Sequence, residues 1–266
     1  MIDSLYNCFK HWSSKGSVYI YSDLHFGDLD CYKIRCEALS KRYVKHNNLN
    51  DVESEILNTY HMYMSFAINE DDFVELCDEA QVKSINGTVH KSDTLIILGD
   101  VGDVELVRKL KAGHKVLIMG NHDKGISNYT RVVERIFKLY SEMTEDDDKY
   151  EWMLVDPTPV GGIYERTIDN RLFDEVYEGP LIISPKIILS HEPINIPYCL
   201  NIHGHCHTKI DMIDDAKHLN CCAEWINYKP VSLGEIIKNG CLKDIDDIHR
   251  CTIDKATTRK LKRKGM

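Results

Sequence analysis

Five short polar clusters, each placed directly after an apolar run, constrain this chain more than any other feature of its sequence. The clusters are Asp23-Leu24-His25, Gly99–Asp103, Gly120–Asp123, Ser190–Glu192 and Gly204–His207. The runs before them, at 17–22, 94–98, 115–119, 186–189 and 199–202, are rich in β-branched residues, which predicts buried strands. Because ligand sites in open α/β sheets form outside the carboxyl ends of strands, we expect the five clusters to meet in one site.

The residue types in these clusters are those that bind transition metals. Histidine nitrogen together with carboxylate or amide oxygen suits manganese, iron, zinc or cobalt, whereas calcium and magnesium prefer oxygen alone. Asp23 and His25 are two residues apart, as are His205 and His207. In an extended backbone, residues at this spacing project to the same side, so the two pairs could bind one ion from opposite directions.

Length and charge limit the class of protein. The 266 residues, 43% of them hydrophobic, predict one domain over residues 1–250 and a separate tail at 251–266. The tail is basic, with five Lys or Arg among the six residues 259–264, so it could contact nucleic acid or simply be solvated. The net charge of -9 argues against a broad surface that coats nucleic acid, although it leaves room for a local basic groove.

The cysteines and the hydropathy favour a cytoplasmic protein. Ten cysteines in a chain of this length, with no continuous apolar stretch in residues 1–16, predict reduced thiols in the cytoplasm rather than a disulfide framework. No apolar run approaches the ~20 residues that cross a bilayer. We therefore expect no membrane contact.

A long segment between the first cluster and the second expected strand is predicted to be helical. Residues 29–93 contain no glycine before Gly87, carry apolar residues at three- and four-residue spacing, and far exceed the dozen or so residues that a crossover needs. This helical insertion is either a layer that covers the sheet or a cap over the metal site that selects substrates. In the second case Lys33, Arg35 and Arg42 could contact phosphate oxygens.

The rest of the chain is expected to supply further helices and a second sheet. Helices are predicted at 103–111 and 128–140, strands at 151–155 and 181–183, and a hairpin from 209–213 and 218–222. Ser232 with Glu235 forms a capping-box pattern, which predicts the start of a short helix.

The order D-x-H, G-D-x-x-D, G-N-H-D, H and G-H-x-H resembles the calcineurin-like metallophosphoesterase family, and in particular its small bacterial and phage branch. Every motif position between residues 23 and 207 matches. The resemblance implies an α/β (α+β) fold, built as a four-layer αββα sandwich of two mixed β-sheets flanked by helices. It also implies a dinuclear metal site at the carboxyl ends of the strands, within a metallophosphoesterase domain over residues 1–250.

The resemblance assigns seven residues to two divalent metal ions. Asp23, His25, Asp100 and His207 would bind one ion, and Asp100, Asn121, His191 and His205 would bind the other. Asp100 then bridges both ions, as a carboxylate with two oxygens can. Mn²⁺ is the expected metal, and Fe, Zn, Co or Ni are the alternatives, because a nitrogen and oxygen site accepts several metals.

Other residues near the motifs receive supporting roles. In the family pattern His122 resembles the general acid, and Asp103 would orient it and favour its protonated form, which leaves Asp123 a role either in supporting the ligands or in the turn. His203 is a candidate to support the ligands, and Arg35 is a candidate for substrate binding. Cys206, between two expected ligands, should face away from the metals.

The function implied is hydrolysis of phosphodiester bonds, with phosphomonoesters as a further substrate class, through a hydroxide that bridges the metals. The expected partner is a small phosphoester or a nucleotide. A nuclease acting on DNA or RNA is the alternative enzyme, and a metal-binding interaction scaffold without turnover is the alternative of another class. The oligomeric state, natural substrate and pathway are left open by the sequence.

Overall fold

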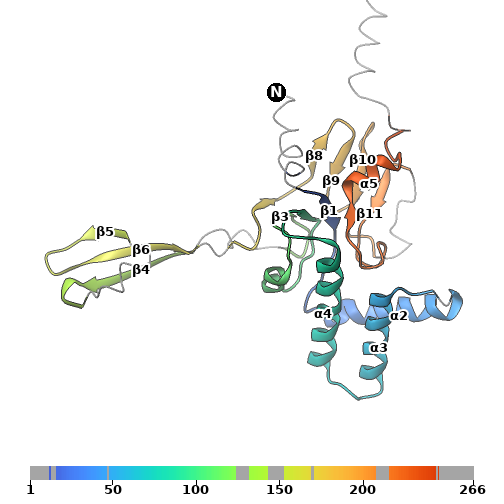
Figure 1. Ribbon diagram of the computed structural model, residues 1–266, viewed down its shortest axis with the longest axis horizontal. Helices are drawn as coiled ribbons and strands as arrows, with labels where there is room; N and C mark the ends of the chain where they lie inside the picture. Colours follow the sequence, from blue (N-terminus) through green and yellow to red (C-terminus); the bar gives the residue numbers. More distant parts are fainter. Residues whose placement is uncertain are drawn as a thin grey trace, which may run out of the picture. The chain divides into compact units, whose positions relative to one another are not determined.

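The computed structural model describes residues 12, 16–46, 48–123, 132–142, 153–168, 171–207, 216–243 and 245. The chain divides into two compact units, of which the first comprises Met1–Lys124 and Asp174–Met266 and the second Gly125–Phe173. All five polar clusters belong to the first unit (Figure 1).

A five-stranded mixed sheet carries the first three clusters. Its strands lie in the order β12 (Val231–Ser232), β1 (Val18–Tyr21), β2 (Thr94–Ile97), β3 (His114–Ile118) and β7 (Glu175–Tyr177). The neighbours from β1 to β7 are parallel, and β12 pairs antiparallel with β1. The central strand β2 is buried along its whole length, as expected for a parallel strand covered on both faces.

A four-stranded mixed sheet carries the last two clusters. It runs in the order β11 (His218–Asn220), β10 (Leu200–His203), β9 (Ile187–Leu189) and β8 (Leu181–Ser184), and only β8 is antiparallel to its neighbour. One hydrophobic cluster joins the two sheets, because it contains Ile96 and Val116 from the first sheet and Leu189 and Ile202 from the second. The expected combination of mixed sheets and helices is therefore confirmed.

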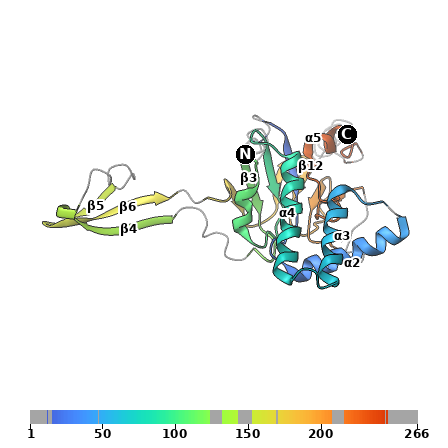
Figure 2. The same ribbon diagram turned by 60° about the horizontal axis from the view of Figure 1, so that its bottom comes forward.

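Three helices fill the segment between β1 and β2, where helices were expected. They are α2 (Leu29–His46), α3 (Asp51–Met64) and α4 (Glu70–Thr88). A capping box joins Asn50 and Glu53 at the start of α3, and Asn69 caps α4. The pair α3 and α4 run side by side in both views (Figures 1 and 2), and α2 contacts both.

The expected helix at 128–140 is wrong where the structure describes it, because Val132–Leu139 is strand β4. Its apolar residues fit both helical and alternating spacing, and the β-branched and aromatic side chains favour a strand once a partner is present. That partner is β6 (Gly161–Ile168), which pairs with β4 over eight residues and, on its other side, with β5 (Met153–Pro157). These three antiparallel strands form the sheet of the second unit. The short 3-10 helix η3 (Tyr140–Glu142) comes directly after β4 in the chain.

The remaining expectations are met in part. The helix predicted at 103–111 is a short 3-10 helix, η1 (Val104–Lys109), and Ser232 caps α5 (Leu233–Lys238) as its capping pattern predicted. The second arm of the predicted hairpin contains strand β11, which pairs parallel with β10. The first arm, at 209–213, and the basic tail lie outside the described residues.

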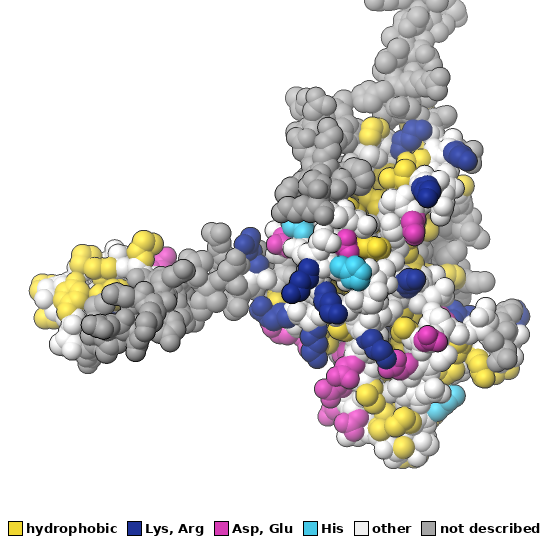
Figure 3. Space-filling view, in the orientation of Figure 1, with side chains coloured by type: hydrophobic (Ala, Val, Ile, Leu, Met, Phe, Trp, Pro, Cys, Tyr) yellow, Lys and Arg dark blue, Asp and Glu magenta, His cyan; other side chains and the backbone are white. Residues whose placement is uncertain are grey.

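The surface and the helices of the described chain add two findings. On the face drawn in Figure 3, basic side chains gather near the middle of the first unit and acidic ones lie directly beside them.

None of the helices within the described ranges has the length and apolar content required to cross a bilayer.

Candidate metal centre

The loops that follow β1, β2, β3, β9 and β10 bring the five polar clusters together. Because β1, β2 and β3 are parallel neighbours, as are β9 and β10, their carboxyl ends open toward the same side of each sheet. A parallel bridge from Ser22 to Cys222 and a hydrogen bond from the His205 N–H to Asp23 Oδ2 (2.9 Å) tie the loops of the two sheets to each other. The polar ends of strands from both sheets thus form one site.

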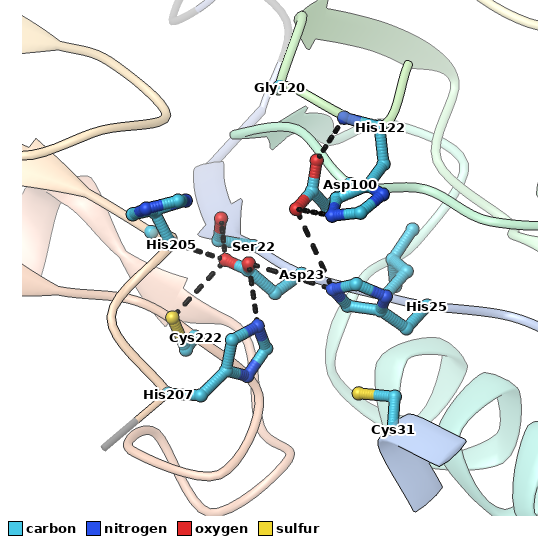
Figure 4. Close-up of polar contacts among 12 residues, drawn as sticks. Ser22, Asp23, His25, Cys31, Asp100, Gly120, His122, His205, His207 and Cys222 are labelled. Atoms are coloured by element: carbon cyan, nitrogen blue, oxygen red, sulfur yellow. Dashed lines mark hydrogen bonds and ion pairs between the residues drawn. The ribbon is translucent and has the colours of Figure 1, made fainter. Parts of the chain in front are cut away.

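A first group of possible ligands contains Asp23, His25 and His207, whose ligand atoms lie within 4.8 Å of one another. Asp23 Oδ1 lies 3.2 Å from His207 Nε2 and 3.9 Å from His25 Nε2. Figure 4 shows the Asp23 carboxylate between the two imidazoles. Three nitrogen and oxygen donors therefore face a common point.

A second group contains Asp100, His191 and His205, also within 4.8 Å of one another. His191 Nε2 lies 3.4 Å from Asp100 Oδ2, 3.2 Å from His205 Nδ1 and 2.9 Å from the amide oxygen of Asn121. The same Asp100 oxygen lies 3.6 Å from His25 Nε2 in the first group. Asp100 therefore stands between the two groups, and all seven residues expected as ligands are brought together.

The backbone at this site is strained. Asp23, His25, Asp100 and His205 all adopt left-handed conformations, with φ of 56°, 47°, 53° and 66°. A residue other than glycine rarely adopts this region, and such strain costs about 1–3 kcal/mol per residue and concentrates at functional sites. The extended backbone expected for Asp23 and His25 is therefore wrong, because two left-handed residues, rather than strand alternation, direct these side chains toward each other.

Two motif glycines permit the close approach of the loops. A Cβ atom on Gly120 would lie 2.3 Å from Asp100 Oδ1, and one on Gly204 would lie 1.9 Å from Ser22 Oγ and 2.3 Å from Asp23 Oδ2. Real Cβ atoms do not approach other atoms this closely. These positions therefore require glycine, because any side chain would push the carboxylates out of place.

Asp123, the last residue of the third cluster, holds two loops in register. Its buried carboxylate accepts backbone N–H groups from Asp100 (2.8 Å), Val101 (2.9 Å) and Gly120 (2.7 Å). This geometry matches the turn role expected for Asp123. It fixes the loop that carries Asp100 against the loop that carries Asn121.

Glu224 is a functional candidate that the sequence did not indicate. Its Oε1 lies 2.5 Å from His207 Nδ1, and its Oε2 lies 3.2 Å from the Nε of Arg35. A carboxylate on the second ring nitrogen fixes the tautomer and direction of an imidazole that binds a metal. Glu224 lies outside every motif, and no local pattern around it marks this contact.

The two further candidates for substrate binding or support lie in different places. Arg35 is only 3% exposed, and it donates to the backbone oxygens of Asp23 (2.5 Å) and Leu24 (3.3 Å). Arg35 thus holds the backbone of the first cluster in place. It also lines the cavity next to the candidate metal centre. His203 is fully buried in β10, its Nδ1 lies 2.8 Å from the Gly204 oxygen, and it belongs to neither ligand group.

His122 lies at the edge of the centre, with its side chain 65% exposed and its Nε2 4.0 Å from Asp100 Oδ2. Its backbone N–H donates to the other oxygen of Asp100 (3.0 Å). The Asp103 carboxylate instead caps η1 by accepting the N–H of Glu105 (3.0 Å). Among the described residues, the structure does not bring Asp103 into contact with His122.

The charges of the centre are strongly coupled. Burial opposes ionisation of Asp23, but the close contact and charge of His207 outweigh it and hold the pKa of Asp23 well below its usual range. Burial alone would lower the pKa values of His191 and His207, yet their contacts with Asp100 for the first, and with Asp23 and Glu224 for the second, raise both to about 9. The centre therefore holds ionised carboxylates that positive charge must balance.

One histidine of the centre behaves differently. Burial, followed by the charge of Arg35, lowers the pKa of His25, so this imidazole is neutral near pH 7. His25 Nε2 and Asp23 Oδ1 are buried without a hydrogen-bond partner among the described residues. Buried polar atoms are nearly always satisfied, and these two atoms are of the types that could bind a cation.

Comparisons with known proteins identify no family. No family model matches the chain, and no curated protein matches it. Among solved structures, the chain is similar to AQ665, a protein of unknown function from Aquifex aeolicus, at 21% identity. The match covers 84% of this chain and 98% of that one with a TM-score of 0.43, a similarity too remote to carry a conclusion about fold or chemistry.

Proposed function

We propose that this chain is a calcineurin-like metallophosphoesterase, a four-layer αββα sandwich whose dinuclear centre hydrolyses phosphodiester bonds, with phosphomonoesters as a further substrate class. One observation carries the proposal. A single Asp100 oxygen lies 3.6 Å from His25 and 3.4 Å from His191, between two groups of nitrogen and oxygen donors. A carboxylate in that position is suited to bridge two cations.

The residues present fit such a centre. Asp23, His25, Asp100 and His207 would hold one ion, and Asp100, Asn121, His191 and His205 the other. The unsatisfied Asp23 Oδ1 and His25 Nε2 gain a partner when a cation binds. Two bound divalent ions would neutralise phosphate oxygens and lower the pKa of water, and the mixed donors favour Mn²⁺, Fe, Zn, Co or Ni.

The chain itself supplies orientation and a proton. In hydrolysis of a diester, water adds to phosphorus, one P–O ester bond breaks, and the leaving oxygen takes up a proton, which yields a monoester and an alcohol. His122 lines the cavity beside Asp100 with an exposed imidazole, so it can reach a leaving oxygen there. Histidine suits proton transfer near neutral pH, and we assign this donation to His122.

Turnover of bis(p-nitrophenyl) phosphate by the Mn²⁺-loaded protein tests the proposal. We expect activity that His122→Ala lowers by about 10²–10⁴-fold while the metal content stays unchanged. His61→Ala, which removes an exposed histidine at the end of α3, is the matched control and should leave activity intact. Metal binding without any turnover dependent on His122 would instead support an interaction scaffold.

A further inference from the structure

A cavity of about 1000 Å³ connects the candidate metal centre with the exposed face of α2. It begins at Asp100, His122 and His207 and follows α2 from Cys31 to Lys45. At about 1.5 Å of rise per residue, this part of the helix spans roughly 20 Å. The volume is at the upper end of the range for small-molecule pockets, so it is larger than a single phosphate group requires.

Part of the cavity wall is apolar and aromatic. Ile34 and Leu39 on α2 line it, and Ile34 is 61% exposed although it is a large aliphatic residue. Trp225 lines the cavity too, and its indole N–H donates to the backbone oxygen of Cys206 (2.8 Å), which fixes the ring. A fixed aromatic ring with aliphatic neighbours is suited to stack against a planar base.

The far end of the cavity is basic. Lys41 and Lys45 line it, are exposed, and form no ion pair with any residue that the structure describes. Arg42, which lies between them, is different because it pairs with Glu53 and contacts Asn227. The positive charge of the two lysines is therefore available to a ligand.

We infer that Lys41 and Lys45 form a second phosphate subsite, and that the substrate is a short nucleotidyl chain with at least one phosphate beyond the scissile one. An acyl chain fits less well, because the end that would receive its methyl terminus is lined by Lys41, Arg42 and Lys45. The position of the scissile bond rests on the proposed function, whereas the subsite can be tested by binding alone.

Binding of phosphorothioate thymidylates by calorimetry, with and without Mn²⁺, tests the subsite. We expect a trimer to bind about tenfold more tightly than thymidine 5′-phosphorothioate, because more phosphates reach basic side chains. The double variant Lys41→Gln/Lys45→Gln should lose this difference. Its slope of log affinity against log salt should be shallower by about 0.7, as the loss of one single-strand phosphate contact predicts.

Two further variants control for charge and folding. Lys33→Gln alters a lysine of the same helix that pairs with Glu70 and does not line the cavity, so it should keep the length dependence. The double variant Lys41→Arg/Lys45→Arg keeps both positive charges, so its binding should also depend on the length of the thymidylate. Equal affinity for monomer and trimer, or unchanged length dependence in the Gln double variant, would overturn the subsite, as would tighter binding of dodecyl phosphate than of the trimer.

The outcomes separate this inference from the proposed function. Turnover of bis(p-nitrophenyl) phosphate without length-dependent binding would support the enzyme and reject the subsite. Length-dependent binding that requires the two lysines, without turnover, would support the subsite and reject the enzyme.

Discussion

Glu224 Oε1 lies 2.5 Å from His207 Nδ1, on the opposite side of the ring from the Nε2 that faces Asp23. The imidazole is therefore held between two carboxylates, one within the candidate metal centre and one behind it. Glu224 also contacts Arg35, which in turn donates to the backbone of Asp23. One half-buried acidic side chain thus links loops of two sheets to helix α2.

Substitution Glu224→Gln should weaken metal binding without removing a ligand. An amide in place of this carboxylate makes the ring less basic and less firmly oriented, and such changes lower metal affinity by about 10–100-fold. Competition with a chromogenic chelator measures the affinity, and thermal unfolding of the metal-free protein reports whether the fold is retained. Glu178→Gln, at an exposed position, is the control, and equal affinities of the two variants would contradict the role assigned to Glu224.

The glycines predict opposite effects of the same substitution at two sites. Gly204→Ala places a methyl group 1.9 Å from Ser22 Oγ, so it should abolish metal binding and destabilise the fold by ~1–3 kcal/mol, as overpacking does. Gly87→Ala in α4 meets nothing within 4 Å and should stabilise the protein by ~0.5–1 kcal/mol, because alanine favours a helix. Denaturant unfolding of both variants provides the comparison, and similar free energies of unfolding would contradict it.

Asp78 predicts a pH-dependent stability that is separate from the metal ligands. Its carboxylate accepts from the Gly27 N–H and the Tyr32 hydroxyl, but burial outweighs these hydrogen bonds and raises its pKa to about 6. The folded protein therefore retains a proton that the unfolded chain, with a pKa of about 3.9, releases. This contribution to stability is complete below about pH 4 and is lost as the pH rises through about 6.

The size and test of this effect depend on the pKa shift. A difference of about two pKa units corresponds to at most ~3 kcal/mol. Between about pH 4 and pH 7, the free energy of unfolding of wild type should therefore fall by up to ~3 kcal/mol relative to that of Asp78→Asn. Denaturant unfolding across that range measures it. Asp71→Asn, an exposed change on the same helix, should run parallel to wild type, and a parallel curve for Asp78→Asn would show that the buried carboxylate does not set the dependence.

Residue type and order predicted the strand ends and the polar clusters that meet there, whereas the choice of seven residues within those clusters came from the resemblance to a known family. Strands β1, β2 and β3 are largely apolar, and a parallel sheet brings the polar residues at their carboxyl ends to one edge. Local sequence carried less information for β4, where the same apolar spacing fits a helix or a strand. Pairing with β6, a contact distant in sequence, decided the outcome.

The geometry around the motifs could not be predicted, because it depends on contacts between distant segments. The left-handed backbone at Asp23 and Asp100 is held by cross-loop hydrogen bonds such as Asp23 N–H to Gly99 O (3.1 Å). Glu224 meets His207 only because β11 lies beside β10. No local pattern in the sequence encodes either arrangement.

The position of Asp100 between the two ligand groups predicts which substitutions remove one ion and which remove both. His25→Ala takes a donor from the first group alone, and His191→Ala takes one from the second alone. Each variant should therefore retain about one metal ion per chain, because the donors of the other group remain. Metal analysis after dialysis against Mn²⁺ measures this stoichiometry.

Asp100→Asn should instead lose both ions. An amide has only one oxygen and no negative charge, so it cannot bridge two cations as a carboxylate does. The Asp100 N–H bond to Asp123 involves only the backbone of residue 100 and is unaffected by the change, so the loop should keep its fold, which thermal unfolding of the metal-free variant reports. If Asp100→Asn retained as much metal as His25→Ala and His191→Ala, the two groups would be independent sites and Asp100 would not be their bridge.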